Sequence, residues 1–136
     1  MTIDTRFYPD DENTDVYKIA RAVYAETGAS SLRAVQAMCA MIANVAIRTG
    51  RSAVDVACDA NVIPAQAVSS PRHDGLNAPV ASRGFQMCLR VARRMLCGGL
   101  DDVTHGATCF HHDDELPDWA VARGYIAEID GMLFYL

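Results

Sequence analysis

The first candidates for chemistry in this sequence are its carboxylates, and only four of them are glutamates: Glu12, Glu26, Glu115 and Glu128. Glu26 differs from the others because it stands in the segment AVYAETG, at the predicted C-terminal end of an apolar helix. A carboxyl group there meets the negative end of the helix dipole and partial burial, and both favour the protonated form. A carboxyl that is protonated near neutral pH can act as a general acid. These features make Glu26 a candidate general acid, although glutamates at helix ends are common.

A second reactive group is the run His111–Asp114, which His105 precedes. Imidazole and carboxylate ligands together suit zinc. However, adjacent residues of a strand point to opposite faces, and the sequence has no HExxH motif. We predict no metal and no cofactor. We expect one of the adjacent histidines, His111, to line a substrate groove, and the other to be solvated.

Several side chains are of the types that bind sugars. Trp119 and Tyr135 can stack on sugar rings, and Gln66, in a long polar loop, can hydrogen-bond hydroxyl or acetamido groups. Tyr24 and Tyr135 can also orient Glu26. We therefore include Tyr24, Gln66, His111, Trp119 and Tyr135 among the predicted substrate-binding residues.

The helices that position these residues are marked by their caps and their apolar periodicity. A first helix is predicted from Asn13 or Thr14 to the stop at Gly28. A second begins at Ser30 or Ser31 and ends at Gly50, and it is apolar nearly all round, which is typical of a central helix. A short helix over 52–59 and a longer one from Ser82 to Cys97 follow, separated by a proline-rich loop over 60–81.

The C-terminal part of the sequence has the pattern of strands. Residues 107–112 favour a strand, and residues 125–129 and 132–136 flank Asp130–Gly131, a strong hairpin signal. The predicted fold class is therefore α+β, mainly α, with a small C-terminal antiparallel hairpin or sheet. We expect an acidic N-terminal arm over residues 1–12 and a single domain over 13–136.

Charge and composition exclude some classes of function. The net charge of −5 argues against nucleic-acid binding, and the apolar runs are too short to insert into a membrane. The five cysteines form no CxxC pair, and we expect reduced thiols that pack as small apolar groups. The first residues are acidic, so we expect synthesis in the cytoplasm without a signal peptide. The oligomeric state is left open.

Five segments together resemble one family. They are YKIARAVYAETG, IANVAIRTG, GFQMCLRVARRML, GATCFHHDDELPDWA and AEIDGMLFY. Their order and spacing are similar to those of the bacterial spore-cortex-lytic and cell-wall hydrolases (SleB type), and the resemblance covers roughly residues 16–136. The Glu26–Gly28 triplet also resembles the Glu–Ser–Gly signature of lytic transglycosylases. Here no second acidic residue follows Glu26, and Cys109 stands where relatives often carry histidine.

The resemblance implies a lysozyme-like catalytic domain that cleaves the glycan strands of peptidoglycan, with Glu26 as acid and then base and Asn44 as a site residue. It also implies the transglycosylase route, in which the sugar's own 6-hydroxyl attacks and gives a 1,6-anhydro product. If water attacks instead, Asp55, Asp59 and Asp74 are possible second carboxylates. A phage or prophage lysis or virion enzyme, or an effector exported by another route, fits the absence of a signal peptide.

Two other functions remain open at this point. One is a zinc-dependent cell-wall amidase or peptidase that uses the His105–Asp114 region. The other is a glycan-binding module without catalysis, suggested by the missing second acidic residue.

Overall fold

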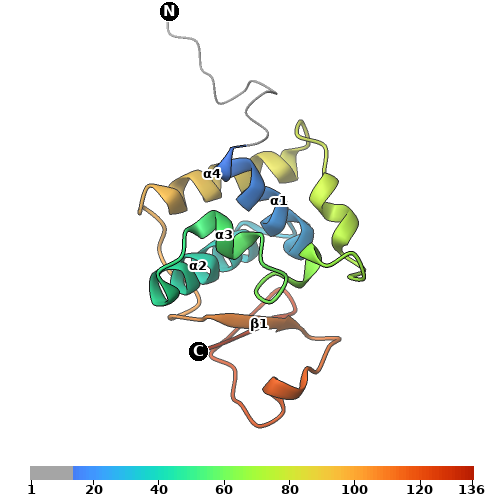
Figure 1. The fold of residues 1–136 in the computed structure, drawn as a ribbon, viewed down its shortest axis with the longest axis vertical. Helices are drawn as coiled ribbons and strands as arrows, with labels where there is room; N and C mark the ends of the chain where they lie inside the picture. Colours follow the sequence, from blue (N-terminus) through green and yellow to red (C-terminus); the bar gives the residue numbers. More distant parts are fainter. Residues whose placement is uncertain (1–13) are drawn as a thin grey trace, which may run out of the picture.

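The structure is a computed structural model that describes residues 14–136, in which helices and strands occupy separate parts of the chain (Figure 1). Four α-helices come first, and a small three-stranded antiparallel sheet follows at the C-terminal end. The predicted mainly helical α+β class is confirmed. The predicted acidic arm, 1–12, lies outside the described residues.

The helices begin and end close to the capping residues that were predicted from the sequence. They are α1 (Asp15–Thr27), α2 (Leu32–Thr49), α3 (Ala53–Ala57) and α4 (Arg83–Leu96). The hydroxyls of Ser31, Ser52 and Ser82 accept hydrogen bonds from backbone N–H groups three residues later, which caps α2, α3 and α4. Gly28 and Gly50 follow α1 and α2 in the left-handed conformation that glycine adopts at little cost.

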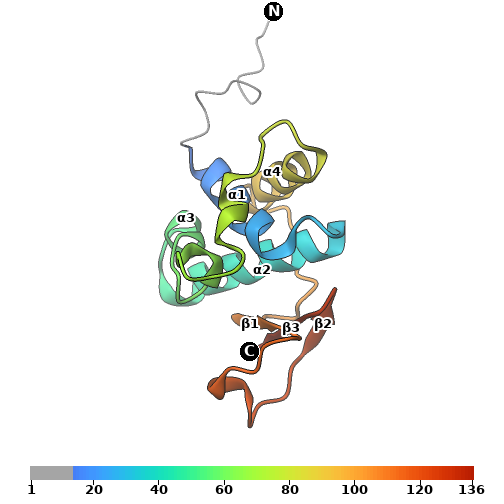
Figure 2. The same cartoon turned by 90° about the vertical axis from the view of Figure 1, so that its right-hand side faces the viewer.

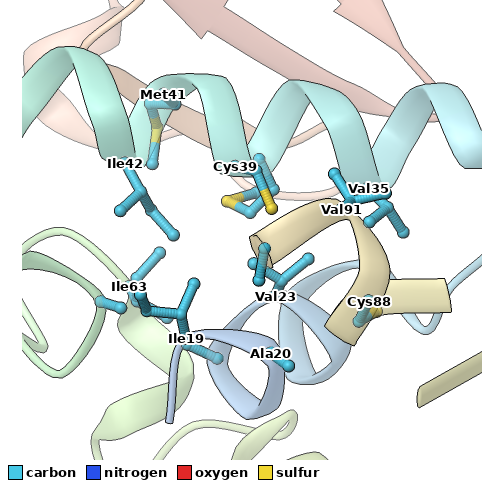
Figure 3. Close-up of a cluster of buried hydrophobic side chains, with 14 of the residues drawn as sticks. Ile19, Ala20, Val23, Val35, Cys39, Met41, Ile42, Ile63, Cys88 and Val91 are labelled. Atoms are coloured by element: carbon cyan, nitrogen blue, oxygen red, sulfur yellow. The ribbon is translucent and has the colours of Figure 1, made fainter. Parts of the chain in front are cut away.

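The helix α2 lies in the middle of the molecule, between the α1–α4 layer and the sheet (Figure 2). Its buried residues meet those of α1, α4 and the long loop, for example Val23, Ile63 and Cys88 around Cys39 and Ile42 (Figure 3). Leu96, the last residue of α4, is 46% exposed although it is apolar. The inward position at the end of α4 is taken by Met95, and Leu96 falls about 100° further round the helix.

The loop over residues 60–81 is a packed element rather than a free stretch of chain. It contains two 3₁₀ helices, η3 (Pro64–Gln66) and η4 (His73–Asn77), which lie against each other and against α1. Nδ1 of His73 is 2.8 Å from the carbonyl oxygen of Ala65. Gly75 is so close to α1 that a Cβ there would lie 2.8 Å from Cα of Ala25. The loop is therefore fixed directly over the end of α1.

The sheet consists of β1 (Cys109–His112), β2 (Ala127–Ile129) and β3 (Met132–Tyr135) in the order β1-β3-β2. Asp130 and Gly131 both have positive φ, 50° and 78°, and make the predicted two-residue turn between β2 and β3. Phe110 of β1 pairs with Phe134 of β3, and both are buried towards the helices. The short helix η5 (Asp118–Ala120) lies in the loop between β1 and β2.

All five cysteines are in the described part of the chain, and none forms a disulfide. Cys39 and Cys88 are buried in the core, as expected of small apolar groups, and burial raises the pKa of the Cys88 thiol to about 12. Cys58 and Cys97 are instead exposed. Within residues 14–136, none of the helices has the length and apolar character that crossing a membrane requires.

Candidate functional site

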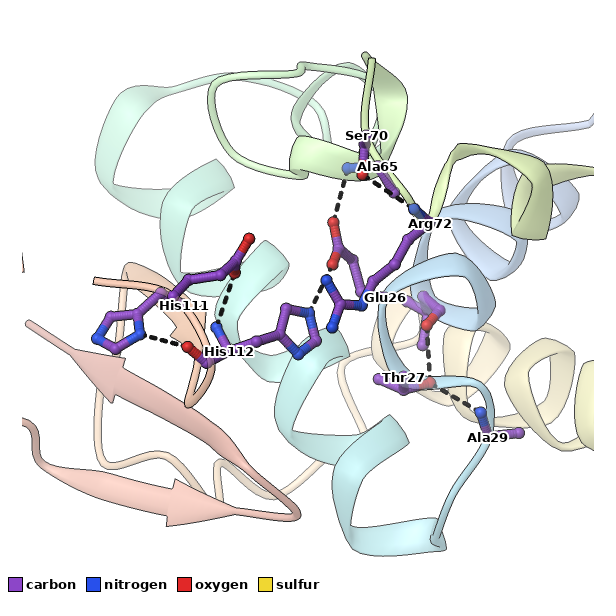
Figure 4. Close-up of polar contacts among 10 residues, drawn as sticks. Glu26, Thr27, Ala29, Ala65, Ser70, Arg72, His111 and His112 are labelled. Carbon is purple, nitrogen blue, oxygen red and sulfur yellow. Dashed lines mark hydrogen bonds and ion pairs between the residues drawn. The ribbon is translucent and has the colours of Figure 1, made fainter. Parts of the chain in front are cut away.

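Glu26 lies in the last turn of α1 and is 4% exposed. Both of its carboxyl oxygens have a hydrogen-bond partner from a distant segment (Figure 4). Oε2 accepts a hydrogen bond of 2.7 Å from the backbone N–H of Ala65 in η3, and Oε1 is 2.9 Å from Nε2 of His112 in β1. The burial predicted for this carboxyl is present, and the group is held in one orientation from two sides.

The chain turns sharply just after Glu26, and hydrogen bonds of the Thr27 side chain stabilise this turn. The hydroxyl of Thr27 donates to the carbonyl of Val23 at 2.8 Å and accepts from the N–H of Ala29 at 3.1 Å. Ala29 has a positive φ of 53°, next to the left-handed Gly28. Glu26 therefore stands at a defined corner between α1 and α2.

His112 reaches Glu26 because alternate residues of β1 face alternate sides of the sheet. Phe110 and His112 face the helices, and their rings are edge-on with centroids 5.6 Å apart. The expectation that one of the two adjacent histidines is solvated is wrong. The His112 side chain is 12% exposed and His111 is buried, because helices cover one face of β1 and aromatic rings cover the other.

A cavity of about 310 Å³ opens at the Glu26–His112 pair. Its wall comes from three parts of the chain: the α1–α2 corner, the 60–81 loop and the sheet. The polar residues in that wall are Glu26, Thr27, Ser30, Arg72, His112 and Asp130. A substrate in this cavity would meet a buried carboxyl, an imidazole and a guanidinium together.

Asp130 is a second carboxylate in this wall, although the sequence pattern predicted it only as a turn residue. Its Oδ2 accepts hydrogen bonds from the hydroxyls of Ser31, at 2.6 Å, and Ser30, at 2.9 Å. These bonds hold the pKa of Asp130 below its usual value, so it stays ionised. The carboxylates proposed for water activation, Asp55, Asp59 and Asp74, do not line this cavity.

A second cavity, of about 330 Å³, has residues of β1 and of the segment after it in its wall; we call it the outer cavity, and the one at Glu26 the inner cavity. The outer cavity is lined by Pro64, Phe110, His111, Glu115, Leu116, Pro117 and Trp119. Nε2 of His111 is 2.8 Å from the hydroxyl of Tyr135, and the Trp119 ring stands edge-on to Tyr135 with centroids 5.0 Å apart. Trp119 keeps 39% of its surface exposed. Of the predicted sugar-binding residues, the structure thus brings His111, Trp119 and Tyr135 into one cluster.

The two cavities have neighbouring residues in their walls. Pro64 lines the outer cavity and the next residue, Ala65, holds Glu26. His111 lines the outer cavity and the next residue, His112, lines the inner one. The two cavities are therefore near each other in the fold, and Glu26 and His112 are in the wall of the inner one.

The other predicted site residues are not brought to Glu26. The Tyr24 ring packs edge-on against Phe85, and the Gln66 amide donates to the carbonyl of Ala57. The Asn44 amide donates to Asp102 and to the carbonyl of Ala107 and lines separate hollows beside α2. The hydroxyl of Tyr135 is engaged by His111 rather than by Glu26.

Within residues 14–136, no three His, Cys, Asp or Glu side chains form a group that could hold a metal ion. Both ring nitrogens of His111 have partners, the His112 carbonyl at 2.7 Å and the Tyr135 hydroxyl, and one ring nitrogen of His112 faces Glu26.

The chain matches no protein-family model, no curated protein and no solved structure. The resemblance to the spore-cortex-lytic and cell-wall hydrolases, and with it the lysozyme-like fold, therefore stays a prediction.

Proposed function

We propose that this protein is a glycan-cleaving enzyme that acts on the strands of peptidoglycan, with Glu26 as its general acid. The observation that carries the proposal is the setting of Glu26. It is a nearly buried carboxyl, held through both oxygens by Ala65 and His112, in the wall of an open cavity. A carboxyl that is fixed in one orientation at the wall of a cavity is placed to exchange a proton with a bound substrate.

The chemistry follows from that setting. Glu26 gives its proton to the glycosidic oxygen as the bond from that oxygen to the sugar's anomeric carbon breaks. The carboxylate that results is stabilised by the N–H of Ala65. It then takes a proton from the attacking group, which is water or the 6-hydroxyl of the same sugar, and so returns to its starting state. His112, 2.9 Å from Oε1, orients the carboxyl and can exchange a proton with it.

A polymeric sugar fits the arrangement of the two cavities. In this proposal a chain that is bound at Glu26 in the inner cavity extends to the neighbouring outer cavity, where the ring of the half-exposed Trp119 can stack on a sugar. A chain that is cut in its middle needs contacts beyond the sugar next to the acid, and the outer cavity would supply them.

The test is to incubate purified sacculi with the wild type and with Glu26→Gln, and to identify the soluble products by mass spectrometry. The amide introduced by this substitution can still accept from Ala65 and donate to His112, so the fold is retained, but it has no proton to give. General acid–base catalysis contributes typically 10²–10⁴-fold, so we expect turnover to fall by at least about 10²-fold. Glu128→Gln, at an exposed glutamate of β2, is the matched control and should keep full activity.

Three results would contradict the proposal. They are near-wild-type turnover in Glu26→Gln with circular dichroism unchanged, release of peptides rather than sugars, and loss of activity in EDTA that zinc restores. Of the sugar products, 1,6-anhydro ends indicate attack by the 6-hydroxyl, and reducing ends indicate attack by water. Binding to sacculi without any product from the wild type would make the protein a glycan-binding module.

A further inference from the structure

Arg72 is a cation in the wall of the cavity that contains Glu26 and His112. Figure 4 shows its side chain extending beside Glu26 towards the Glu26–His112 pair. The residue is half-buried, and the sequence analysis assigned it no role. It is a place where the cavity can contact a negatively charged part of a ligand.

The position of Arg72 relative to Glu26 is fixed by the folded loop. Its N–H donates to the hydroxyl of Ser70 at 3.1 Å, and its carbonyl accepts from the N–H of Gly75 at 3.1 Å. Gly75 in turn packs against Ala25, the residue before Glu26. An arginine whose backbone is held in this way loses less freedom when it binds a ligand than one on a mobile loop.

The guanidinium has no partner within the part of the chain that the structure describes. Neither the Arg51–Asp59 ion pair nor the hydrogen bond between Glu26 and His112 involves Arg72, and no side-chain hydrogen bond among residues 14–136 involves its guanidinium. The other carboxylate of the wall, Asp130, is engaged by two serine hydroxyls. The guanidinium of this cavity-lining residue has five N–H donors in a planar fork, which matches the two oxygens of a carboxylate.

We propose that Arg72 forms a carboxylate-binding subsite beside Glu26, which makes the enzyme prefer glycan strands that carry carboxylates over neutral ones. This inference rests on the proposed function. In peptidoglycan the carboxylate can be that of a free lactyl group on the sugar or that of a stem peptide. Bidentate binding would fix the sugar's register along the cavity, and so place one particular glycosidic bond at Glu26.

The experiment measures binding by isothermal calorimetry in a Glu26→Gln background, where the ligand is not consumed. Three ligands of equal length are compared. They are a neutral N-acetylglucosamine oligomer, a peptide-free peptidoglycan strand with free lactyl groups, and the same strand carrying stem peptides. Arg72→Gln removes the charge and the fork, and Arg90→Gln, an exposed arginine of α4 outside the cavity, is the matched control.

Arg72→Gln should weaken binding of an acidic strand by about tenfold to a hundredfold, the usual size of a hydrogen bond to a charged group. Binding of the neutral oligomer should stay within about twofold, and Arg90→Gln should change none of the three. A loss for the peptide-free strand assigns the lactyl carboxylate, and a loss confined to the peptide-bearing strand assigns the stem.

An equal loss for all three ligands, or no loss for any of them, would overturn the inference while the proposed function stands. If the Glu26→Gln protein with Arg72 intact binds none of the ligands, the proposed function itself fails, and the subsite fails with it. Thermal unfolding of each variant shows whether the fold is intact.

Discussion

The pairing of Glu26 with His112 can be tested through stability as well as through activity. In His112→Ala the Oε1 atom of Glu26 loses its partner, although the Glu26 side chain is only 1% exposed. A buried polar atom left without a hydrogen bond costs about 1–3 kcal/mol. The lost edge-on contact between the His112 ring and Phe110 adds to that cost. We therefore expect the free energy of unfolding to fall by about 2–3 kcal/mol.

A double-mutant cycle separates this pair from a general loss of packing. Urea unfolding is measured for His112→Ala, Glu26→Ala and the double variant. If the two side chains contact each other as in the structure, their effects are not additive, and the coupling energy should be about 1–3 kcal/mol. The control cycle replaces Glu26→Ala with Glu128→Ala, at an exposed position in β2, and should be additive.

A glutamine at position 112 separates positioning from proton exchange. Its side-chain N–H can donate to Oε1 of Glu26, so His112→Gln should recover most of the stability lost in the alanine variant. The glutamine cannot take up a proton. If His112 exchanges a proton with Glu26, the turnover of His112→Gln should therefore be about 10²-fold below that of the wild type. Additivity of the Glu26 and His112 effects within about 0.5 kcal/mol would refute the pairing. Full turnover in His112→Gln would limit the imidazole to orienting the acid.

Two further variants test the surroundings of the site. Gly75→Ala places a Cβ 2.8 Å from backbone Cα of Ala25, so the loop must shift. Overpacking of this kind costs roughly 1–3 kcal/mol, and both urea stability and glycan cleavage should fall, whereas Gly124→Ala, with open space around it, should change neither. Burial raises the pKa of Asp102, but hydrogen bonds from a threonine, from Asn44 and from backbone N–H groups outweigh it and lower the pKa overall. A lowered pKa adds stability that is present above the pKa of the unfolded chain and is lost as pH falls through that of the folded one. Asp102→Asn should therefore lower the free energy of unfolding by about 1 kcal/mol at pH 7. Urea unfolding should show this difference from the wild type becoming smaller in acid. A difference that does not depend on pH would contradict the hydrogen-bond argument.

The fold could be predicted largely because its signals are local. Serine caps, left-handed glycines and the Asp130–Gly131 turn each act within a few residues, so they predict the four helices and the hairpin without knowledge of the rest of the fold. The two 3₁₀ helices of the 60–81 loop were missed because the cause of their order is not local. It is the close packing of Gly75 on Ala25, some fifty residues earlier.

The candidate site likewise has one feature that is determined locally and others that depend on distant parts of the chain. The position of Glu26 at the end of a buried helix could be predicted from its own segment, but its partners are 39 and 86 residues further along the chain. A signal for His112 was nevertheless present. Phe110 is the apolar residue that must face the helices, and strand alternation puts His112 on the same face and His111 on the other.

Because the partners of Glu26 come from distant segments, the setting of the proposed acid depends on the sheet. The helical corner supplies Glu26, the loop supplies the Ala65 N–H, and β1 supplies His112. If the sheet is not in place, Glu26 loses the partner of Oε1 and part of the cover that keeps it from water. The sheet is held to the helices through Phe110 and Phe134, which are buried in the same core as α2. Packing at these two rings, remote from any substrate atom, therefore controls the geometry of the proposed acid through His112, two residues along the same strand.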